Sequence, residues 1–148
     1  MNPKYITISP IGIIHSPFQE VEGTPLQPVR SQALGTLEVF PEYGPGLQDI
    51  EGFSHLIILY LFHREGQTRM IVKSYLEESI HGVFATRSPR RPNHIGISTV
   101  ELIGREGNFL RVLGIDVFNG TPLLDIKPYV PKIDDRPGAR SGWLEHLW

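Results

Sequence analysis

The sequence contains no cysteine among its 148 residues. That absence excludes disulfide bonds, a thiolate nucleophile and any zinc site built on cysteine, and it is compatible with a reducing compartment. The six histidines show no His-x-x-x-His or similar ligand spacing. We therefore expect no metal ion.

Long apolar runs are also missing. No stretch approaches the roughly 20 apolar residues needed to cross a bilayer, and no charged and then apolar leader precedes a cleavage site. We therefore expect a soluble, cytoplasmic protein without a membrane partner. By length, residues 1–148 are predicted to form one domain, with 131–148 as a C-terminal extension.

Two further absences bear on the fold. No Gly-x-Gly-x-x-Gly follows a first strand, and no alternation of strands with helices is visible, so a Rossmann fold is not expected. Thirteen prolines and fifteen glycines disfavour long helices. The only plausible helices are 46–51 and 69–78, and the second is weakened by two β-branched residues and a tyrosine.

Seven short segments rich in Ile, Val, Leu and Phe are predicted as strands: 6–15, 34–40, 55–62, 83–86, 95–103, 109–118 and 123–127. The run 56–62 is apolar on both faces, which predicts a central strand. Partial alternation over 96–103 predicts a half-buried strand, and 104–108 should close a hairpin. This pattern indicates a mostly β domain, and strand count alone leaves barrel and sandwich open.

The net charge of −2 gives no global reason to expect a nucleic-acid partner. Its distribution is uneven, because residues 86–140 carry nine Lys or Arg against six Asp or Glu, whereas residues 1–85 carry five against nine. A basic surface in the second part would suit a phosphate-bearing partner. A chance asymmetry on a solvated domain is the other reading.

Residues 84–97 place three arginines between two strand-like runs. Pro89 and Pro92 fix the backbone, so Arg87, Arg90 and Arg91 should leave it in set directions. The planar fork of arginine suits phosphate or carboxylate. This segment therefore predicts a binding site, and the alternative is a charged loop that protects a sheet edge.

Residues 116–131 form a second stretch of this kind. Asn119-Gly120 predicts a tight turn, because both residue types tolerate a positive φ. Asp116, Asp125 and Lys127 should therefore lie near strand ends. We expect the two stretches to form one composite pocket, although such charges also serve as plain caps and edge guards.

Several motifs occur in an order that resembles one known family. They are Pro10 to Pro17, Thr24 to Pro28, Gly52 to Leu56 with Phe62-His63, Val83 to Ser88, Arg91 to Asn93 with Ile95-Gly96, Gly120 to Pro122 and Asp125 to Tyr129. Together they resemble the TsaA-like S-adenosylmethionine-dependent tRNA (adenine-N6)-methyltransferases over nearly the whole chain. The chain departs from the family pattern at His94, where Pro is common, and at Asn119, where Asp is common.

The resemblance implies a small antiparallel β-barrel of about seven strands with one or two short helices. It implies S-adenosylmethionine as methyl donor, bound near the interface of a homodimer. The acceptor would be N6 of the threonylcarbamoyl-modified adenosine beside the tRNA anticodon. Longer family members carry an extra C-terminal domain, so this chain resembles a short form.

By the same resemblance, the donor pocket should involve residues from five places in the chain: Pro28, Val29, Arg30, His63, Arg64, Arg87, Ile97, Leu113, Gly114, Ile115 and Asp116. Within it, Arg87 would bind the donor carboxylate as a fork, and its alternative role is a tie to a loop carbonyl.

On the acceptor side, Asp125 would take the N6 proton, Tyr129 would stack on the base, and Lys127 would meet a phosphate or carboxylate. Their ordinary alternatives are a turn cap, half-buried packing and an edge guard, respectively. Asn119 cannot act as a base, so if the family's turn Asp contributes, this protein must either do without it or use Asp116.

Three functions stay open at this point. The first is a tRNA adenine-N6 methyltransferase. The second is a donor-binding barrel that acts on another RNA position or on a small molecule. The third is an RNA-binding module without catalysis. Donor binding separates the first two from the third.

Overall fold

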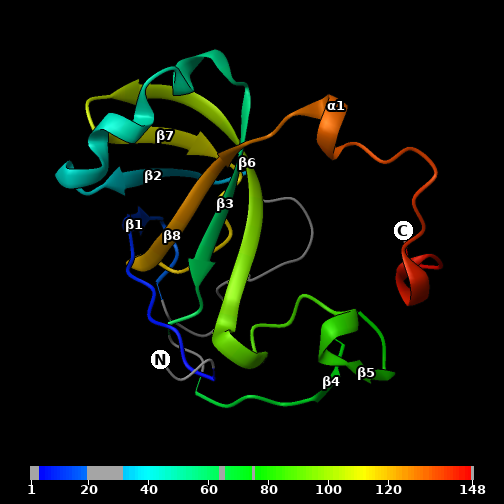
Figure 1. The fold of residues 1–148 in the computed structure, drawn as a ribbon. Helices are drawn as coiled ribbons and strands as arrows, with labels where there is room; N and C mark the ends of the chain where they lie inside the picture. Colours follow the sequence, from blue (N-terminus) through cyan, green and yellow to red (C-terminus); the bar gives the residue numbers. More distant parts are fainter. Residues whose placement is uncertain (1–3, 20–31, 64–65, 75, 148) are drawn as a thin grey trace.

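The computed structural model describes residues 4–19, 32–63, 66–74 and 76–147, and its main body is a closed antiparallel β-barrel (Figure 1). Around the barrel the strands follow the order β1-β2-β7-β6-β3-β8, and β8 pairs back with β1. Their bounds are β1 Gly12–His15, β2 Leu34–Val39, β3 His55–Leu61, β6 Ile95–Glu106, β7 Phe109–Leu113 and β8 Thr121–Pro128. The expected mostly β barrel is confirmed, with six strands instead of about seven.

A separate two-stranded sheet, β4 (Ile71–Lys73) and β5 (Ile80–Gly82), lies beside the barrel. The helix expected over 69–78 is therefore wrong, because the β-branched pair Ile71 and Val72 enters a strand. The strand expected over 83–86 is also wrong, since Val83–Ala85 forms a 3₁₀ turn. We call β4, β5 and their connection the hairpin.

Helical structure in the described residues is short. One α-helix, α1, spans Pro131–Asp134. The remaining turns are 3₁₀ helices at Pro41–Leu47, Ile50–Gly52, Val83–Ala85, Pro92–His94 and Gly142–Leu144. The first two overlap the helix expected over 46–51. None of the helices in the described ranges is long and apolar enough to cross a membrane.

Strand β3 pairs with β6 on one side and with β8 on the other, and in this closed barrel each of the six strands likewise has two neighbours. Alternate residues of each strand point into the barrel. Fully buried members of this core are Ile14, Leu37, Leu56, Ile58, Leu110, Val112, Ile115 and Leu123. Burying this apolar surface is the main driving force for closing the barrel.

One extra residue in β8 changes which side chains face outward. The register pairs Leu59 with Asp125 but Tyr60 with Leu123, so Leu124 forms a β-bulge. Beyond the bulge, Ile126 packs against the core while Asp125 and Lys127 face outward. β-Bulges commonly re-aim side chains in this way.

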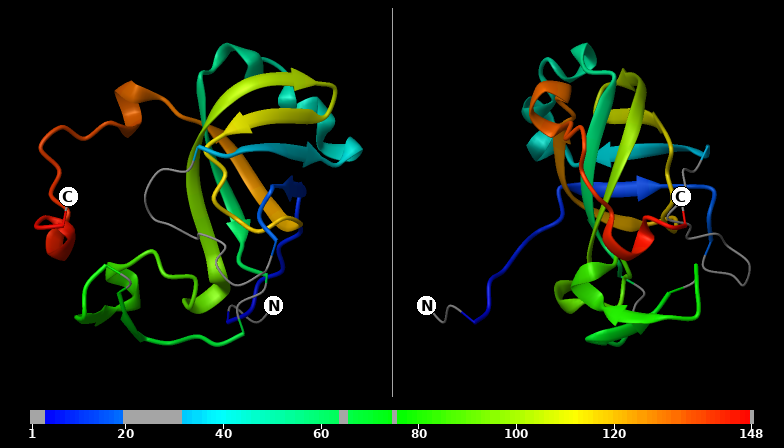
Figure 2. Two further views of the ribbon diagram at one scale, coloured as in Figure 1. Left: turned by 180° about the vertical axis from the view of Figure 1, so that it is seen from behind. Right: turned by 90° about the vertical axis from the view of Figure 1, so that its right-hand side faces the viewer.

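The residues after β8 leave the barrel and return to a different part of the molecule. Residues 131–147, here called the C-terminal segment, run outward past α1, and their end lies beside the hairpin (Figures 1 and 2). Every residue of 131–142 is exposed. This path brings the end of the described chain close to the loop that precedes β6.

Candidate active site

The loop between Val83 and β6 is shaped by its own side chains. Thr86 Oγ1 donates to the Val83 carbonyl at 2.7 Å and accepts from the Ser88 amide at 3.2 Å. Arg91 Nη1 donates to the carbonyls of Thr86 and Ser88 at 2.9 and 3.2 Å. Arg91 is therefore a tie that holds the loop.

Arg87 lies inside this tied turn, and its side chain is left available. Arg87 and Arg90 are both exposed, and no described residue forms an ion pair or a side-chain hydrogen bond with either guanidinium. A planar fork without an internal partner can bind an external carboxylate or phosphate. Of the three loop arginines, two thus keep their binding capacity.

The end of the loop has an unusual backbone. Asn93 and His94 have φ of 66° and 52°. Asn and His are enriched in this left-handed region relative to other non-glycine residues. A ring N–H at Nδ1 of His94 donates to the Pro89 carbonyl at 2.9 Å, which places His94 in a structural role within the loop.

A buried chain of hydroxyls links three barrel segments. Ser98, on β6, donates to Asp116 Oδ1 at 2.9 Å, and the Tyr60 hydroxyl from β3 lies 2.7 Å from Ser98 Oγ. Because Ser98 gives its proton to Asp116, the Tyr60 hydroxyl is the donor to Ser98. Tyr60 and Ser98 are buried and Asp116 is half-buried. The three side chains fix the orientation of one carboxylate near the barrel wall.

The surroundings of this chain shift two pKa values. Burial raises the pKa of Asp116, opposed in part by the Ser98 hydrogen bond. Burial, and then the Asp116 carboxylate, raises the pKa of Tyr60, while the positive charge of Arg87 acts in the opposite direction. Tyr60 therefore stays protonated as a donor, and Arg87 lies within electrostatic reach of the same site.

A glycine makes room for this arrangement. A Cβ at Gly96 would lie 2.4 Å from Cε2 of Tyr60 and 2.7 Å from the end of the Phe62 ring. The two rings meet edge to face, with centroids 5.4 Å apart. Gly96 thus allows Tyr60 to lie flat against β6, from where its hydroxyl reaches Ser98.

The segment that leads to Asp116 is held by its backbone. The amides of Gly114 and Ile115 both donate to the Ala33 carbonyl, at 2.8 and 3.2 Å. Gly114 has a φ of 105°, a value that favours glycine. The Ile115 side chain is fully buried, so only its backbone is available to a ligand. Leu113 is half-buried at the end of β7.

Asp125 and Lys127 form a separate pair on the outer side of the barrel. Lys127 Nζ lies 3.0 Å from Asp125 Oδ2, and their side chains are 62% and 44% exposed. Asp125 Oδ1 also accepts from the Ile126 amide at 2.9 Å. Both charges are accessible and mutually paired, which fits the edge-guard alternative as well as a role with a ligand.

Tyr129 is held at both ends. Its amide donates to the His55 carbonyl at 3.0 Å, and its ring meets the His55 ring edge to face at 6.4 Å. Its hydroxyl donates to Asp135, and this bond is the first cause of a raised Tyr129 pKa. The ring is half-buried. Tyr129 is therefore a rigid element next to the Asp125 and Lys127 pair in sequence.

The positions of the other residues expected in the donor pocket say less about their roles. His63 is exposed, two residues after the end of β3. Ile97 is 45% exposed on the outer side, and its carbonyl lies 3.4 Å from the Tyr60 hydroxyl. Four expected residues lie outside the described residues: Pro28, Val29, Arg30 and Arg64.

Asp116 is joined to Tyr60 through Ser98, and the charge of Arg87, from the other motif stretch, is near enough to lower the pKa of Tyr60. In the described chain the contacts of Asp125, Lys127 and Tyr129 are separate from that network. One composite pocket therefore stays a prediction. Within the described residues no group of three His, Asp or Glu is arranged to hold a metal ion.

Sequence reasoning missed Tyr60 and Ser98. The signal that could have found them is a polar side chain at an inward position of a strand, since Tyr60 and Ser98 alternate in phase with buried Ile58 and Val100. A buried hydroxyl needs a partner, so two of them on paired strands point to a polar site between those strands.

Asn119 fills a structural role in the turn before β8. Its Oδ1 accepts from the Ser16 amide at 2.9 Å, and its own amide donates to the Phe18 carbonyl at 2.7 Å. Gly120 follows with a φ of 87°, as expected for this turn. The amide oxygen of Asn119 thus does here what a carboxylate oxygen could also do.

Comparison with known proteins adds evidence of a different kind. Residues 13–135 match the model of the tRNA-methyltransferase O N-terminal domain. A probable S-adenosyl-L-methionine-binding protein of Pyrococcus abyssi is 55% identical over 144 residues, which cover 97% of this chain and 78% of that protein. A rat tRNA (adenine(37)-N6)-methyltransferase is 41% identical over 133 residues, covering 84% of this chain and 31% of its own length.

Solved structures agree in fold and in sequence. A crystal structure of TrmO from Pseudomonas aeruginosa superimposes with a TM-score of 0.76 and 42% identity, covering 94% of this chain and 62% of that one. The similarity therefore extends over the whole barrel, while the chain spans under two thirds of that solved protein. On the match over residues 13–135, the chain belongs to the tRNA-methyltransferase O N-terminal domain family.

Proposed function

We propose that this protein transfers a methyl group from S-adenosylmethionine to N6 of the threonylcarbamoyl-modified adenosine next to the tRNA anticodon. The rat relative and a human one, 39% identical over 133 residues, are named as tRNA (adenine(37)-N6)-methyltransferases. This chain spans only 31% and 30% of them. The proposal therefore rests on the barrel and its site. A protein that acts on tRNA in this way is inferred to work in the cytoplasm.

The observation that carries the proposal is the hydrogen-bonded chain from Tyr60 through Ser98 to Asp116, together with an exposed Arg87 whose positive charge acts on Tyr60. S-adenosylmethionine supplies a methyl group on a positively charged sulfur, next to an amino acid end with one carboxylate and one ammonium. The fork of Arg87, which has no side-chain partner among the described residues, suits the carboxylate, and the carboxylate of Asp116 suits a cationic or hydrogen-donating group. The two charges thus match the donor in sign.

The remaining donor contacts are proposed from the family resemblance. Backbone groups of Leu113, Gly114 and Ile115 lie immediately before Asp116, and Ile97 shares its carbonyl with the Tyr60 network. His63 is proposed to lie at the rim of the pocket. Four further residues complete the proposed set: Pro28, Val29, Arg30 and Arg64.

On the acceptor side, Asp125 is proposed to take the N6 proton as the new nitrogen–carbon bond forms. Lys127, whose Nζ lies 3.0 Å from Asp125 Oδ2, would orient that carboxylate and meet a phosphate or the carboxylate of the modified base. Tyr129 would stack on the adenine, because its hydroxyl bond to Asp135 fixes the ring. Alignment of donor and acceptor, rather than strong acid–base chemistry, would supply most of the acceleration.

We also propose a homodimer. Strands β3 and β6 present Leu59, Leu61, Ile95 and Ile97 on the outer side of the barrel, and Ile95 and Ile97 are 39% and 45% exposed. Exposed apolar residues grouped on one face are typical of protein interfaces. Light scattering after gel filtration should give twice the chain mass, and Ile97→Glu should give a monomer.

Donor binding is tested by calorimetry with S-adenosylmethionine. The wild type should bind in the micromolar range, and Arg87→Ala should lose about tenfold or more, because a charge-assisted hydrogen bond contributes about 1.5–3 kcal/mol. Arg111→Ala is the matched control, an exposed arginine on β7, and should bind as the wild type does. Failure of the wild type to bind would remove both methyltransferase functions and leave the RNA-binding module.

The acceptor is tested with methyl-labelled donor and two preparations of one tRNA, with and without the threonylcarbamoyl group. Label at N6 of the modified base alone supports the full proposal. Label elsewhere in RNA would favour a donor-binding barrel with another acceptor, as the name of the Pyrococcus abyssi relative would allow. No label with bound donor would reject tRNA as the substrate.

A further inference from the structure

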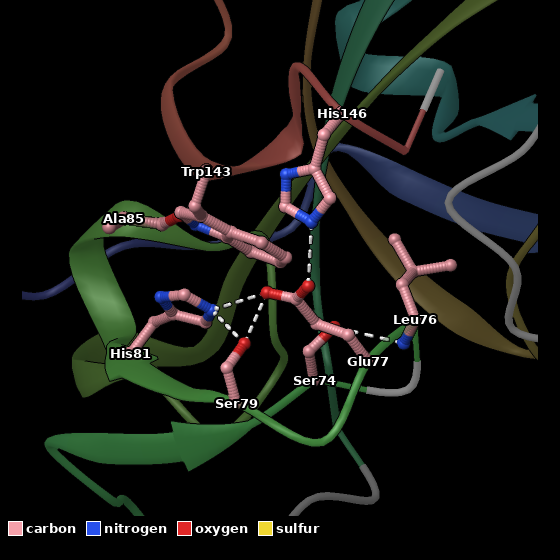
Figure 3. A network of polar contacts seen from close by, with 8 residues as sticks. All are labelled: Ser74, Leu76, Glu77, Ser79, His81, Ala85, Trp143 and His146. Carbon is pink, nitrogen blue, oxygen red and sulfur yellow. Dashed lines mark hydrogen bonds and ion pairs between the residues drawn. The ribbon is translucent and has the colours of Figure 1, made fainter.

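The C-terminal segment is fastened to the hairpin by a small group of side chains. Figure 3 shows Trp143 lying over His81, and Glu77 facing Ser79, His81 and His146. The pairs that cross between the two segments, His81 with Trp143 and Glu77 with His146, are 62 and 69 residues apart in sequence. Because residues 131–142 are all exposed, these are the hydrogen bonds and ring contacts through which the described segment meets the hairpin.

Trp143 makes two contacts of different kinds. Its ring stacks on the His81 ring, with centroids 3.9 Å apart and planes 14° from parallel. Its indole N–H donates to the carbonyl of Ala85 at 2.8 Å. Stacking supplies contact area, and the single hydrogen bond supplies direction. Trp143 therefore holds one particular backbone group, the Ala85 carbonyl.

Glu77 supports the contact from the hairpin. Its Oε2 accepts from His146 Nε2 at 2.9 Å, while its Oε1 accepts from the Ser79 hydroxyl and lies 3.3 Å from His81 Nε2. The Ser79 bond and then the His146 bond lower the pKa of Glu77, so the carboxylate is ionised at neutral pH. One charge thus orients His81 under the indole and binds His146.

A short path leads from the Ala85 carbonyl to the proposed donor site. Ala85 ends the 3₁₀ turn that Thr86 caps, since the Thr86 amide and hydroxyl both donate to Val83. Thr86 and Ser88 flank Arg87, and Arg91 ties their two carbonyls. A displacement of Ala85 would therefore shift the backbone at Arg87 and change the direction in which the Arg87 side chain leaves it.

We propose that Trp143 and His146 are positioning residues for the donor site: by fastening the C-terminal segment to the hairpin, they hold the turn at Ala85 and so set the orientation of Arg87. This inference rests on the proposed role of Arg87 in donor binding. It gives the C-terminal segment a part in donor recognition, although the segment itself need not touch the donor.

The test combines hydrogen exchange with donor calorimetry on the full chain. Trp143→Ala should speed amide exchange over residues 80–88 and weaken S-adenosylmethionine binding about fivefold to tenfold, as expected when an ordered hydrogen bond is lost. Trp143→Phe keeps the stacking ring and loses the N–H, so it should show an intermediate effect. His146→Ala should act in the same direction, and His146→Gln should restore part of the affinity.

Lys132→Ala is the matched control, an exposed side chain of the same segment, and should change neither readout. The KM for tRNA, measured at saturating donor, should stay unchanged in the Trp143 and His146 variants, whereas a general loss of fold would change it. Unchanged donor affinity in Trp143→Ala, with a wild type that binds normally, would overturn the positioning role alone. A wild type that binds no donor would overturn it together with the proposed function, and unchanged exchange would overturn the contact itself.

Discussion

Two small polar networks, one inside the barrel and one on the hairpin, each contain a single carboxylate bound by a serine hydroxyl. In the barrel, Ser98 donates to Asp116, and burial raises the pKa of Asp116. On the hairpin, Ser79 donates to Glu77, and the hydrogen bonds of Glu77 lower its pKa. The serine hydrogen bond lowers the carboxylate pKa at both sites. Desolvation outweighs it at Asp116 but is minor at Glu77, so the net pKa shifts have opposite directions.

The largest expected effect on stability is that of Ser98→Ala. The half-buried Asp116 would lose its hydroxyl donor, and the buried Tyr60 hydroxyl would lose its short bond to Ser98 and keep only the 3.4 Å bond to the Ile97 carbonyl. Unsatisfied buried polar groups cost about 1–3 kcal/mol, so urea unfolding should show a loss in this range. Ser79→Ala, the corresponding change on the hairpin, should cost about 0.5 kcal/mol or less. Equal losses would contradict the distinction between the two networks.

Tyr60→Phe should have a smaller effect. It keeps the ring that packs against Gly96 and removes only the hydroxyl, while Ser98 still binds Asp116. A typical buried hydrogen bond contributes about 0.5–1.5 kcal/mol, and we expect a loss of this size in urea unfolding. Donor affinity should fall less than in Arg87→Ala. A loss as large as that of Ser98→Ala would mean that Tyr60, and not Ser98, carries the network.

The pH dependence of stability should have opposite signs in the two networks. The folded-state pKa of Asp116 lies above its ordinary value of 3.8, so its contribution is full below that value and is lost as pH rises through the folded pKa. The stability of Asp116→Asn relative to the wild type should therefore increase as pH rises from 3 to 7. The folded-state pKa of Glu77 lies below 4.5, so its contribution is present above that value and is lost as pH falls.

Melting temperatures of the wild type, Asp116→Asn and Glu77→Gln over this pH range test the signs. The wild type should lose its advantage over Glu77→Gln as the solution is acidified. Asp116→Asn should weaken donor binding while leaving the fold at least as stable at neutral pH. Parallel difference curves for the two variants would show that burial does not separate the two carboxylates.

The smallest change in stability is expected at the outer pair. Lys127→Met removes an exposed ion pair, which is usually worth about 0.2–1 kcal/mol, so unfolding should shift little. If the acceptor role of this pair holds, methyl transfer should nevertheless fall by tenfold or more, as is common when a residue beside a general base is removed. A variant with normal stability and normal transfer would reduce Lys127 to a guard of the strand edge.

Much of the barrel could be predicted because the signal is local. The strands predicted from the alternation in 96–103 and from the all-apolar run at 56–62 are confirmed as β6 and β3. The Asn119-Gly120 turn is confirmed by the positive φ of Gly120. These features depend on side-chain period and on backbone freedom, which the sequence carries directly.

The hairpin could not be predicted in the same way. Residues 69–78 combine helix-forming and β-branched types, and the pairing of β4 with β5 decides the outcome. Val83–Ala85 has strand-forming residues but closes as a 3₁₀ turn under the Thr86 cap. Strand pairing across the hairpin overrides helix propensity in the first case, and a hydrogen bond from a side chain three residues away overrides strand propensity in the second.

The site was predictable only in its charged members. Arg87 and Asp116 stand out in the sequence as charges in loops, whereas Tyr60 and Ser98 look like ordinary strand residues. Their hydrogen bond joins positions 38 apart, and the next bond joins Ser98 to a residue 18 further on. Only the register of β3 against β6 makes these partners neighbours.

The bulge at Leu124 shifts the inward and outward alternation of side chains along β8 by one residue. Before it, Thr121 and Leu123 face the core, and after it the same parity would place Asp125 and Lys127 in the barrel. The extra residue Leu124 reverses this alternation, so Asp125 and Lys127 lie on the outer side of the barrel. A regular ladder through Leu124 would bring Asp125 and Lys127 into the core in place of Ile126, whereas deleting Leu124 would remove the bulge and leave both charges outside, so with Leu124 present the strand exposes its charged pair only by bulging.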